Sequence, residues 1–349
     1  MSTDNRLLQL RKPFLFGLVV FSAFLLLVEI ALRVFGYQAA VDGNITLIDR
    51  NIVKDPFPNV PYLYEPNASY TQTWPDNPRN YFDDPGNSIT YRINNAGFRG
   101  EEFKKESERI RIVFIGDSFC WGNGVRREDH FQSRLSEQLG PEVETMNFGL
   151  GSFSTKQEVA LYEQIASEYE HQIAVVWFFL NDFNNELGTM SYLGGNDLGR
   201  RLRRLSRIAD LMIAPIEARV KYAQLIEDYQ NAYSDGSEGW SDIKKSLQRF
   251  HKLCRDNKVT PALAVHPILA DLGDGYPFAN IHGKVVAYAE QLGIAAVDLR
   301  PAFEGENGPE LWVHKLDQHP NEEAHKLAAD FYYPSLKELV DVVSSTRRD

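Results

Sequence analysis

The sequence predicts an α/β protein, a three-layer α/β/α sandwich with a parallel sheet, preceded by an N-terminal transmembrane helix and a small β-rich lead-in. Three observations support this prediction. From residue 110 onward, apolar runs alternate with helical patterns, which is typical of a parallel sheet covered by helices. Residues 13–35 are long and apolar enough to cross a bilayer. Residues 36–109 are rich in Pro, Asn, Tyr and Asp, which favours turns and short strands.

The composition of the 349-residue chain narrows the possible functions. A hydrophobic content of 43% is enough for one large α/β domain with accessory segments. The net charge of −11 argues against a nucleic-acid partner, because phosphates require a basic face. Cys120 and Cys254 are too few for a disulfide framework and lack zinc spacing, so they are expected to be buried thiols. We expect no metal and no organic cofactor.

The N-terminal apolar stretch predicts an uncleaved signal anchor. No charge occurs from Pro13 to Val28, and Glu29 and Arg33 are spaced to pair on one helix face near the interface. A cleaved signal peptide is the alternative, but the apolar run is long and no small-x-small site follows it. The basic residues Arg6, Arg11 and Lys12 make residues 1–12 a cytoplasmic tail and place the rest outside, in the periplasm if the source is bacterial.

The alternation within residues 110–345 predicts five strands and five helices. The last helix is expected to open at Pro320-Asn321-Glu322. The expected strands are 110–116, 143–148, 173–180, 259–266 and 294–298, and the expected helices are 128–139, 155–169, 241–257, 278–292 and 321–343.

An insertion at 184–240 interrupts this alternation. Residues 198–229 have a helical pattern, and this segment holds a cluster of arginines: Arg200, Arg201, Arg203, Arg204 and Arg207. Three interpretations are open: a lid over the site, a contact with anionic lipid headgroups or an anionic glycan, and an ordinary solvated basic helix face.

The first strand ends in a pattern that exposes a hydroxyl group. The apolar run Ile110–Ile115 breaks at Gly116-Asp117-Ser118, as expected of a buried strand followed by a tight turn. Because parallel sheets place their chemistry at the carboxyl ends of strands, Ser118 is the candidate nucleophile. Asn181 follows the apolar strand Ile173–Leu180, so its amide is expected at the same edge as an oxyanion donor.

The candidate base lies near the C-terminus. His319 stands in a loop before the last helix, and Asp317 precedes it by two residues. In an extended segment residues i and i+2 point the same way, so the Asp317 carboxylate is expected to orient the His319 imidazole. Four further residues are candidates for shaping the pocket: Asp117, Trp121, Asn123 and His266, the last with a satisfied loop histidine as the alternative.

These segments resemble the motif blocks of the SGNH/GDSL hydrolase superfamily over roughly residues 110–340. Gly116-Asp117-Ser118-Phe119 resembles the first block, Asn147–Thr155 the second, Asn181-Asp182 the third and Asp317–Pro320 the fifth. The resemblance implies a flavodoxin-like fold, Ser118 as nucleophile, His319 as base and Asp317 as its partner. It also implies an oxyanion hole formed by the Ser118 N–H, a backbone N–H of the second block and the Asn181 side chain.

Two positions depart from the usual blocks. The glycine donor position of the second block falls on Ser152, with Gly151 one residue earlier, so either N–H is a candidate. The fifth block usually has two residues between Asp and His and here has one, which puts Leu316 at the usual Asp place and makes Asp317 the candidate partner of His319.

The anchor, the lead-in segment Asn94–Gly100 and the SGNH-like part together resemble bacterial envelope proteins linked to O-acetylation of exported polysaccharides. We therefore expect a membrane-anchored serine esterase that hydrolyses acyl esters, such as acetyl esters, of an extracytoplasmic glycan or lipid-like substrate. An O-acyltransferase with the same residues, and a non-catalytic protein that binds a glycan or a partner, are the alternatives. The sequence does not indicate an oligomeric state.

Overall fold

The computed structural model describes residues 3–37, 45–183 and 197–347, so the first part of the predicted insertion, 184–196, lies outside the described residues. The chain divides into two compact units. One consists of residues 1–44 and 191–224, and the other of residues 45–190 and 225–349. The second unit contains all the predicted site residues. We describe each unit separately.

A five-stranded sheet forms the centre of the second unit. Its order is β10-β9-β8-β6-β7, and every neighbouring pair is parallel. Every residue of β6 and β8 is buried, which explains why these strands are almost entirely apolar, since a parallel sheet is covered on both faces. Arg111 of β6 is the exception within these two strands, and it pairs with Glu144 at 2.8 Å. The strands are β6 (Ile110–Gly116), β7 (Val143–Asn147), β8 (Ile173–Phe179), β9 (Thr260–His266) and β10 (Ala295–Asp298).

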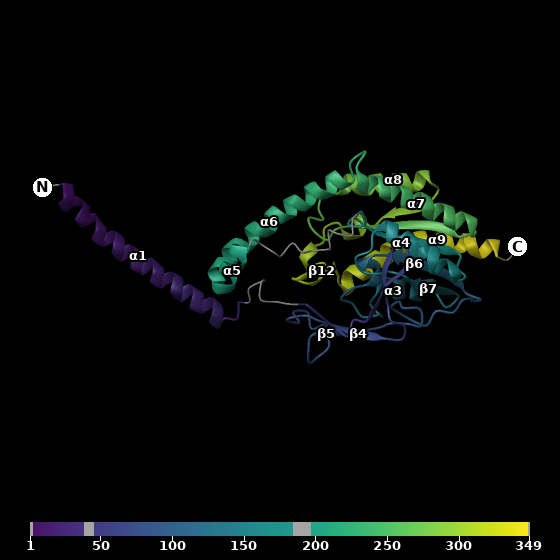
Figure 1. The fold of residues 1–349 in the computed structure, drawn as a ribbon, viewed down its shortest axis with the longest axis horizontal. Helices are drawn as coiled ribbons and strands as arrows, with labels where there is room; N and C mark the ends of the chain where they lie inside the picture. The colour runs from purple at the N-terminus through teal and green to yellow at the C-terminus, as the bar shows by residue number, and fades with distance from the viewer. Residues whose placement is uncertain (1–2, 38–44, 184–196, 348–349) are drawn as a thin grey trace. The chain divides into compact units, whose positions relative to one another are not determined.

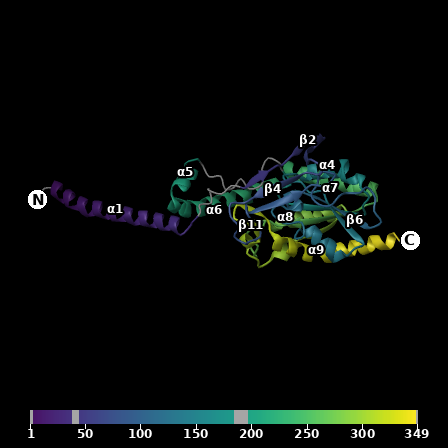
Figure 2. The ribbon, with the colours of Figure 1, turned by 90° about the horizontal axis from the view of Figure 1, so that it is seen from below.

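Helices cover both faces of this sheet (Figures 1 and 2). Right-handed crossovers in this strand order put α4, α7 and α8 on one face and α3 and α9 on the other. The bounds are α3 (Phe131–Leu139), α4 (Thr155–Gln164), α7 (Glu238–Asp256), α8 (Ala279–Gln291) and α9 (Glu322–Thr346). Asn321 caps α9 by accepting from the N–H groups of Glu323 and Ala324, both at 3.0 Å. The predicted three-layer sandwich is confirmed, with the flavodoxin-like strand order.

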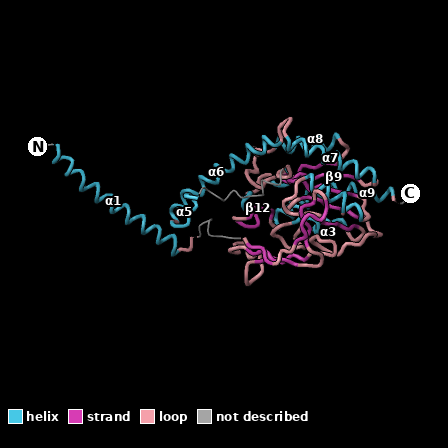
Figure 3. The backbone as a smooth tube through the Cα atoms, in the orientation of Figure 1, coloured by secondary structure: helices cyan, strands magenta, loops and turns pink. Residues whose placement is uncertain are grey.

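The lead-in contains several short strands, drawn in magenta in Figure 3, and the strands that pair there are antiparallel. Strands β1, β4 and β5 form one small sheet, and β2 and β3 form a hairpin. The bounds are β1 (Thr46–Ile48), β2 (Ile52–Phe57), β3 (Val60–Tyr64), β4 (Ser69–Thr73) and β5 (Ser88–Arg92). The predicted β-rich lead-in is thus present.

Several short elements complete the second unit. Helix α2 (Ser118–Trp121) directly follows β6, and β11 (Trp312–His314) pairs antiparallel with β12 (Asp317–Pro320) just before α9. Single 3₁₀ turns lie at Ala166–Glu168, Arg300–Phe303 and Gly308–Leu311. Cys120 and Cys254 are free and buried, as predicted.

The first unit is helical. It contains α1 (Thr3–Val34), α5 (Asp197–Leu205) and the first part of α6 (Arg207–Ala232). The segment Pro13–Val34 has a mean hydropathy of 2.6 and none of it is buried, so it is long and apolar enough to cross a membrane. A membrane anchor and a signal sequence both fit this helix. The predicted pair of Glu29 and Arg33 forms, with 2.8 Å between Oε1 and Nη2.

Candidate active site

The strand order places two predicted site residues at one crevice. After β6 the chain continues to β7 on one side, and after β7 it returns across β6 to β8 on the other side. Ligands of such sheets bind outside the carboxyl ends of the strands where this direction reverses, which is here between β6 and β8. Ser118 follows β6 and Asn181 follows β8, and Gly116 pairs with Trp177 in the register between these strands.

A sharp strand-to-helix turn presents Ser118. Asp117 is the N-cap of α2, and its carboxylate accepts from the Phe119 N–H at 2.8 Å. Position 116 leaves no room for a side chain, because a Cβ atom there would lie 2.7 Å from the Trp177 carbonyl oxygen and 2.6 Å from Cys120 Cβ. Ser118 itself is 7% exposed.

The structure brings Ser118, His319 and Asp317 into one hydrogen-bonded row. Ser118 Oγ lies 2.8 Å from His319 Nε2, and His319 Nδ1 contacts Asp317 Oδ1. Asp317 and His319 both lie on β12, where residues two apart share a face. The Asp317 carboxylate therefore reaches His319 although only one residue separates them, where the usual block has two. The Asn123 side-chain amide lies 3.2 Å from His319 Nδ1.

Burial and neighbouring groups shift the pKa values of the residues in this row. Burial opposes protonation of His319, but the Asp317 carboxylate outweighs it and raises the His319 pKa above 6.5. For Asp317 burial acts to raise the pKa, while His319 and the Trp74 indole bring it below 3.8. Burial raises the pKa of Asp117 to about 6. The imidazolium that forms when Ser118 loses its proton is therefore stabilised by a carboxylate that stays ionised.

The lead-in supplies a residue of the site that the sequence did not indicate. The Trp74 indole Nε1 donates to Asp317 Oδ2 at 3.1 Å, so the second oxygen of this buried carboxylate is also satisfied. Asp76 next to it contacts His314 of β11 and accepts from Lys315 at 3.0 Å. The lead-in thus holds the paired strands β11 and β12. His319, expected in a loop, lies on β12.

Arg99 of the lead-in holds the turn after the nucleophile. Its guanidinium is buried and donates to the carbonyls of Trp121 at 3.1 Å, Gly122, and Val125 at 2.6 Å. The Tyr91 hydroxyl accepts from the Gly124 N–H at 2.7 Å. Both ends of the candidate site are therefore fixed by residues from outside the α/β sandwich.

We expect Trp74→Phe to lower kcat for an ester substrate by about tenfold, because a hydrogen bond to a charged group contributes about 1.5–3 kcal/mol. Steady-state hydrolysis of a nitrophenyl ester measures the effect. Trp121→Phe is the matched control, since the buried Trp121 indole N–H has no hydrogen-bond partner in the part of the chain that the structure describes. Equal loss in both variants would contradict a specific role for the Trp74 N–H.

The candidate oxyanion donors surround Ser118. A Cβ atom on Gly151 would lie 3.8 Å from Ser118 Cβ, and the Gly151 carbonyl accepts from the Tyr62 hydroxyl at 2.9 Å. Within residues 45–183 and 197–347, the amide N–H groups of Ser118, Gly151 and Ser152 donate to no protein acceptor. Ser152 has φ +65°, a backbone conformation that favours glycine, which agrees with its place at the glycine position of the second block.

Asn181 lies beside Asp117. Asn181 is 8% exposed, and its amide donates to the Asp117 carboxylate and lowers the Asp117 pKa against the larger effect of burial. An amide nitrogen carries two hydrogens, so one remains for an oxyanion. Asp117 is thus a positioning residue for Asn181, and its Oδ2 lies 3.4 Å from Ser118 Oγ, farther than His319 Nε2.

Two of the residues predicted to shape the pocket belong to the core. Trp121 is 2% exposed and stacks on Tyr64 of the lead-in with 4.7 Å between ring centroids. His266 is also 2% exposed, and its Nδ1 donates to the Pro267 carbonyl at 2.9 Å. Burial lowers the pKa of His266 to about 3. Neither side chain offers a surface to a substrate, so His266 is the satisfied histidine that the sequence left as the alternative.

Further carboxyl groups lie beneath the site. Glu158 of α4 is fully buried, and both of its oxygens lack a hydrogen-bond partner among the described residues. Burial raises the pKa values of Glu158 and Asp182 well above their ordinary values. Charge raises them further: that of Asp117 acts on Glu158, and those of Glu158 and Asp117 act on Asp182.

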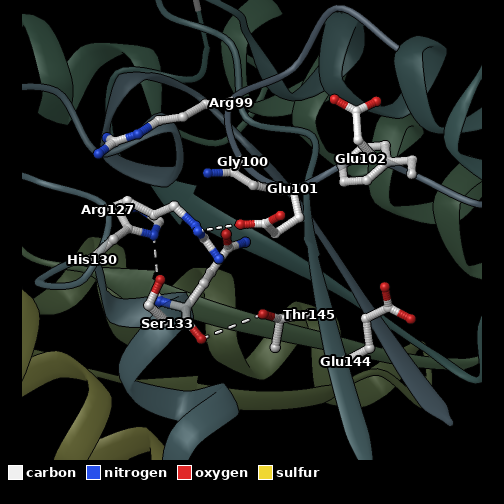
Figure 4. Close-up of a pocket in the computed structure, with 12 residues that line it drawn as sticks. Arg99, Gly100, Glu101, Glu102, Arg127, His130, Ser133, Glu144 and Thr145 are labelled. Atoms are coloured by element: carbon white, nitrogen blue, oxygen red, sulfur yellow. Dashed lines mark hydrogen bonds and ion pairs between the residues drawn. The ribbon is translucent and has the colours of Figure 1, made fainter. Parts of the chain in front are cut away.

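A separate pocket lies between the end of the lead-in, α3 and β7 (Figure 4). Its lining carries both charges, including Arg99, Glu102 and Glu144, and Arg127 pairs with Glu101. None of the predicted site residues lines this pocket. The candidate active site is therefore the row of side chains at Ser118.

The comparisons with known proteins give matches among solved structures alone. No known protein family and no curated protein matches the chain. A G-D-S-L family lipolytic protein from Desulfitobacterium hafniense is 16% identical, with a TM-score of 0.39 over 65% of this chain and 99% of that chain. A carbohydrate acetylesterase from Sinorhizobium meliloti is 11% identical, with a TM-score of 0.40 over 66% and 100% of the two chains. An acetyl xylan esterase is 16% identical, with a TM-score of 0.42 over 65% and 99%.

The evidence for a family resemblance comes from this chain itself. It is the parallel sheet with the order β10-β9-β8-β6-β7 and the row of Ser118, His319 and Asp317 at its edge. In its motif blocks, their order along the chain and the fold that carries them, the chain resembles the SGNH and GDSL hydrolases.

Proposed function

We propose that this chain is a membrane-anchored serine esterase that cleaves acyl esters through an acyl-enzyme. The observation that carries the proposal is the 2.8 Å distance from Ser118 Oγ to His319 Nε2, with His319 Nδ1 paired to the buried Asp317. Nucleophile, base and orienting carboxylate are the three parts that an activated serine requires.

Acylation begins when Ser118 Oγ attacks the ester carbonyl and its proton passes to His319 Nε2. Negative charge develops on the carbonyl oxygen, where the N–H groups of Ser118, Gly151 or Ser152 and Asn181 can donate to it. As the tetrahedral intermediate collapses, the carbon–oxygen bond to the alcohol breaks and His319 returns the proton to the leaving oxygen. The product is an ester of Ser118.

Deacylation repeats these steps with water. His319 Nε2 takes a proton from the water, the hydroxide attacks the acyl carbon, and the proton passes back to Ser118 Oγ as the acid leaves. Asp317 stays ionised throughout and holds the His319 tautomer in which Nδ1 carries the proton. A sugar hydroxyl in place of water would make the same site an O-acyltransferase.

The proposed location and substrate follow from the N-terminal part of the chain. The span Pro13–Val34 follows the basic residues Arg6, Arg11 and Lys12, and a positive flank of this kind stays in the cytoplasm. The site would then lie outside, where exported glycans and lipids carry acyl esters. The combination of the anchor, the lead-in segment Asn94–Gly100 and the SGNH-like part supports this substrate class, because it resembles bacterial envelope proteins linked to O-acetylation of exported polysaccharides.

Labelling with a fluorophosphonate tests the proposal on the full chain in detergent micelles. We expect covalent labelling of the wild type at Ser118, located by peptide mass spectrometry, and none in the Ser118→Ala variant. Ser345→Ala, a change in the last turn of α9, is the control and should label fully. A wild type that is folded by circular dichroism and unlabelled would overturn the esterase proposal and favour a protein that binds glycans without catalysis.

A further inference from the structure

The helical insertion in the first unit buries an ion-pair network and exposes many of its apolar side chains. The Arg203 side chain is 3% exposed and donates to Asp210 at 2.7 Å and to Glu217 at 2.6 Å. Asp210 is 1% exposed as well. The facing sides of α5 and α6 are therefore joined by a buried ion-pair network.

The opposite side of the same two helices is apolar and exposed. Met212, Ile216 and Val220 repeat every fourth residue on α6, so they form one stripe along the helix. Each is at least 64% exposed. Further exposed apolar side chains of the insertion are Leu202, Leu205 and Leu211. This distribution is the reverse of a water-soluble helix pair, which buries its apolar stripe and solvates its charges.

Glu29 of α1 fixes this insertion to the apolar helix. Its carboxylate accepts from Ser206 Oγ at 2.9 Å, from the Arg207 N–H at 2.9 Å and from the Ile208 N–H at 3.0 Å. These N–H groups belong to the first turn of α6, whose unpaired donors and positive dipole end favour an anion. Arg33 adds a bond from Nη2 to the Leu205 carbonyl, at 2.9 Å.

The position of Glu29 sets the depth at which the insertion begins. Glu29 lies five residues before Val34, the end of the candidate span. At about 1.5 Å per residue, the first turn of α6 is level with a point about 8 Å inside that end. A carboxylate within an apolar span is costly unless it finds partners, and here the insertion provides them. The insertion thus starts within the layer where a bilayer meets water.

We propose that α5 and residues 207–223 of α6 lie in the membrane interface beside the anchor, with the stripe Met212–Ile216–Val220 in contact with lipid chains. We choose the bilayer as the occupant because Glu29 joins the first turn of α6, the helix that carries the stripe, to a helix that is itself apolar and exposed. Exposed Arg201 and Arg204 of α5 would meet lipid phosphates at this depth. The inference rests on the anchoring part of the proposed function and does not depend on the esterase activity.

The test places a nitroxide spin label at single cysteines of the full chain in vesicles of phosphatidylcholine and phosphatidylglycerol. Cys120 and Cys254 are fully buried, and unlabelled wild type checks that they do not react. The labelled variants are Ile216→Cys on the stripe, Leu26→Cys on the anchor, and Val342→Cys on α9. Val342 is the matched control, since it is an apolar helix residue, 58% exposed, in the other unit. Ester hydrolysis and circular dichroism check that each variant is folded.

We expect the ratio of collisions with oxygen to collisions with a water-soluble nickel complex to be several-fold higher at Ile216 than at Val342. A high ratio at Leu26 with a water-like ratio at Ile216 would overturn this inference and leave the anchor intact. A water-like ratio at both Leu26 and Ile216 would overturn anchoring as well. Protection of Ile216 from both reagents, with spin–spin broadening, would identify a second copy of the chain as the occupant and also overturn it.

Discussion

Replacing Ser118 with alanine is expected to lower kcat by about 10⁵–10⁶-fold for any ester substrate, because no acyl-enzyme can form. The change removes one small, nearly buried oxygen from α2, so the free energy of unfolding should change by about 1 kcal/mol. Steady-state hydrolysis of a nitrophenyl ester and urea unfolding measure the two effects on the same preparations.

His319→Ala should cost about as much as Ser118→Ala, and the double variant should be no worse than either, because the residues act as one unit. This non-additivity is what distinguishes a shared mechanism from two separate structural effects. Multiplicative losses in the double variant would contradict direct proton transfer between Ser118 and His319.

Replacing Asp317 with asparagine is expected to lower kcat by about 10⁴-fold, since the His319 tautomer is no longer held and the imidazolium loses its counter-charge. It should also move the pH profile. Activity requires neutral His319, so in the wild type kcat/KM falls as the pH drops through the His319 pKa, which Asp317 raises above 6.5. Without that carboxylate, burial lowers the pKa, and the acid limb moves to lower pH.

The profile of kcat/KM against pH measures this shift, because it reports the ionisation of the free enzyme. Asp256→Asn, a charge removal on the exposed C-terminal end of α7, should leave both the rate and the acid limb unchanged. An acid limb that stays in place in Asp317→Asn would show that another group, such as Asp117 with its pKa of about 6, controls the profile.

The sheet and its helices could be predicted because their signals are local. The run Ile110–Ile115 is β-branched and buried on both faces, which the observed β6 satisfies. For the same reason the expected strand 173–180 agrees with the observed β8, Ile173–Phe179, to within one residue. The contact between Asp317 and His319 could also be predicted, because residues two apart in an extended segment point to the same side.

The contribution of the lead-in could not be predicted in this way. Trp74 and Arg99 lie in segments without helical or strand periodicity over many residues, and their partners are far along the chain. Trp121 was expected near a pocket for its position after Ser118, yet stacking on Tyr64 turns it toward the lead-in. Contacts of this kind are made by tertiary packing between distant segments, and local sequence patterns do not predict them.

The distance along the chain between the parts of the site has a consequence for when the protein becomes active. Ser118 and His319 are 201 residues apart, and Trp74 and Asp317 are 243 apart. At about 5–20 residues per second, a ribosome completes the base about 10–40 s after the nucleophile. If the anchor guides export during synthesis, Ser118 would cross the membrane before its base has been made. The proposed hydrolysis could then begin only after the segment that carries His319 has crossed and folded.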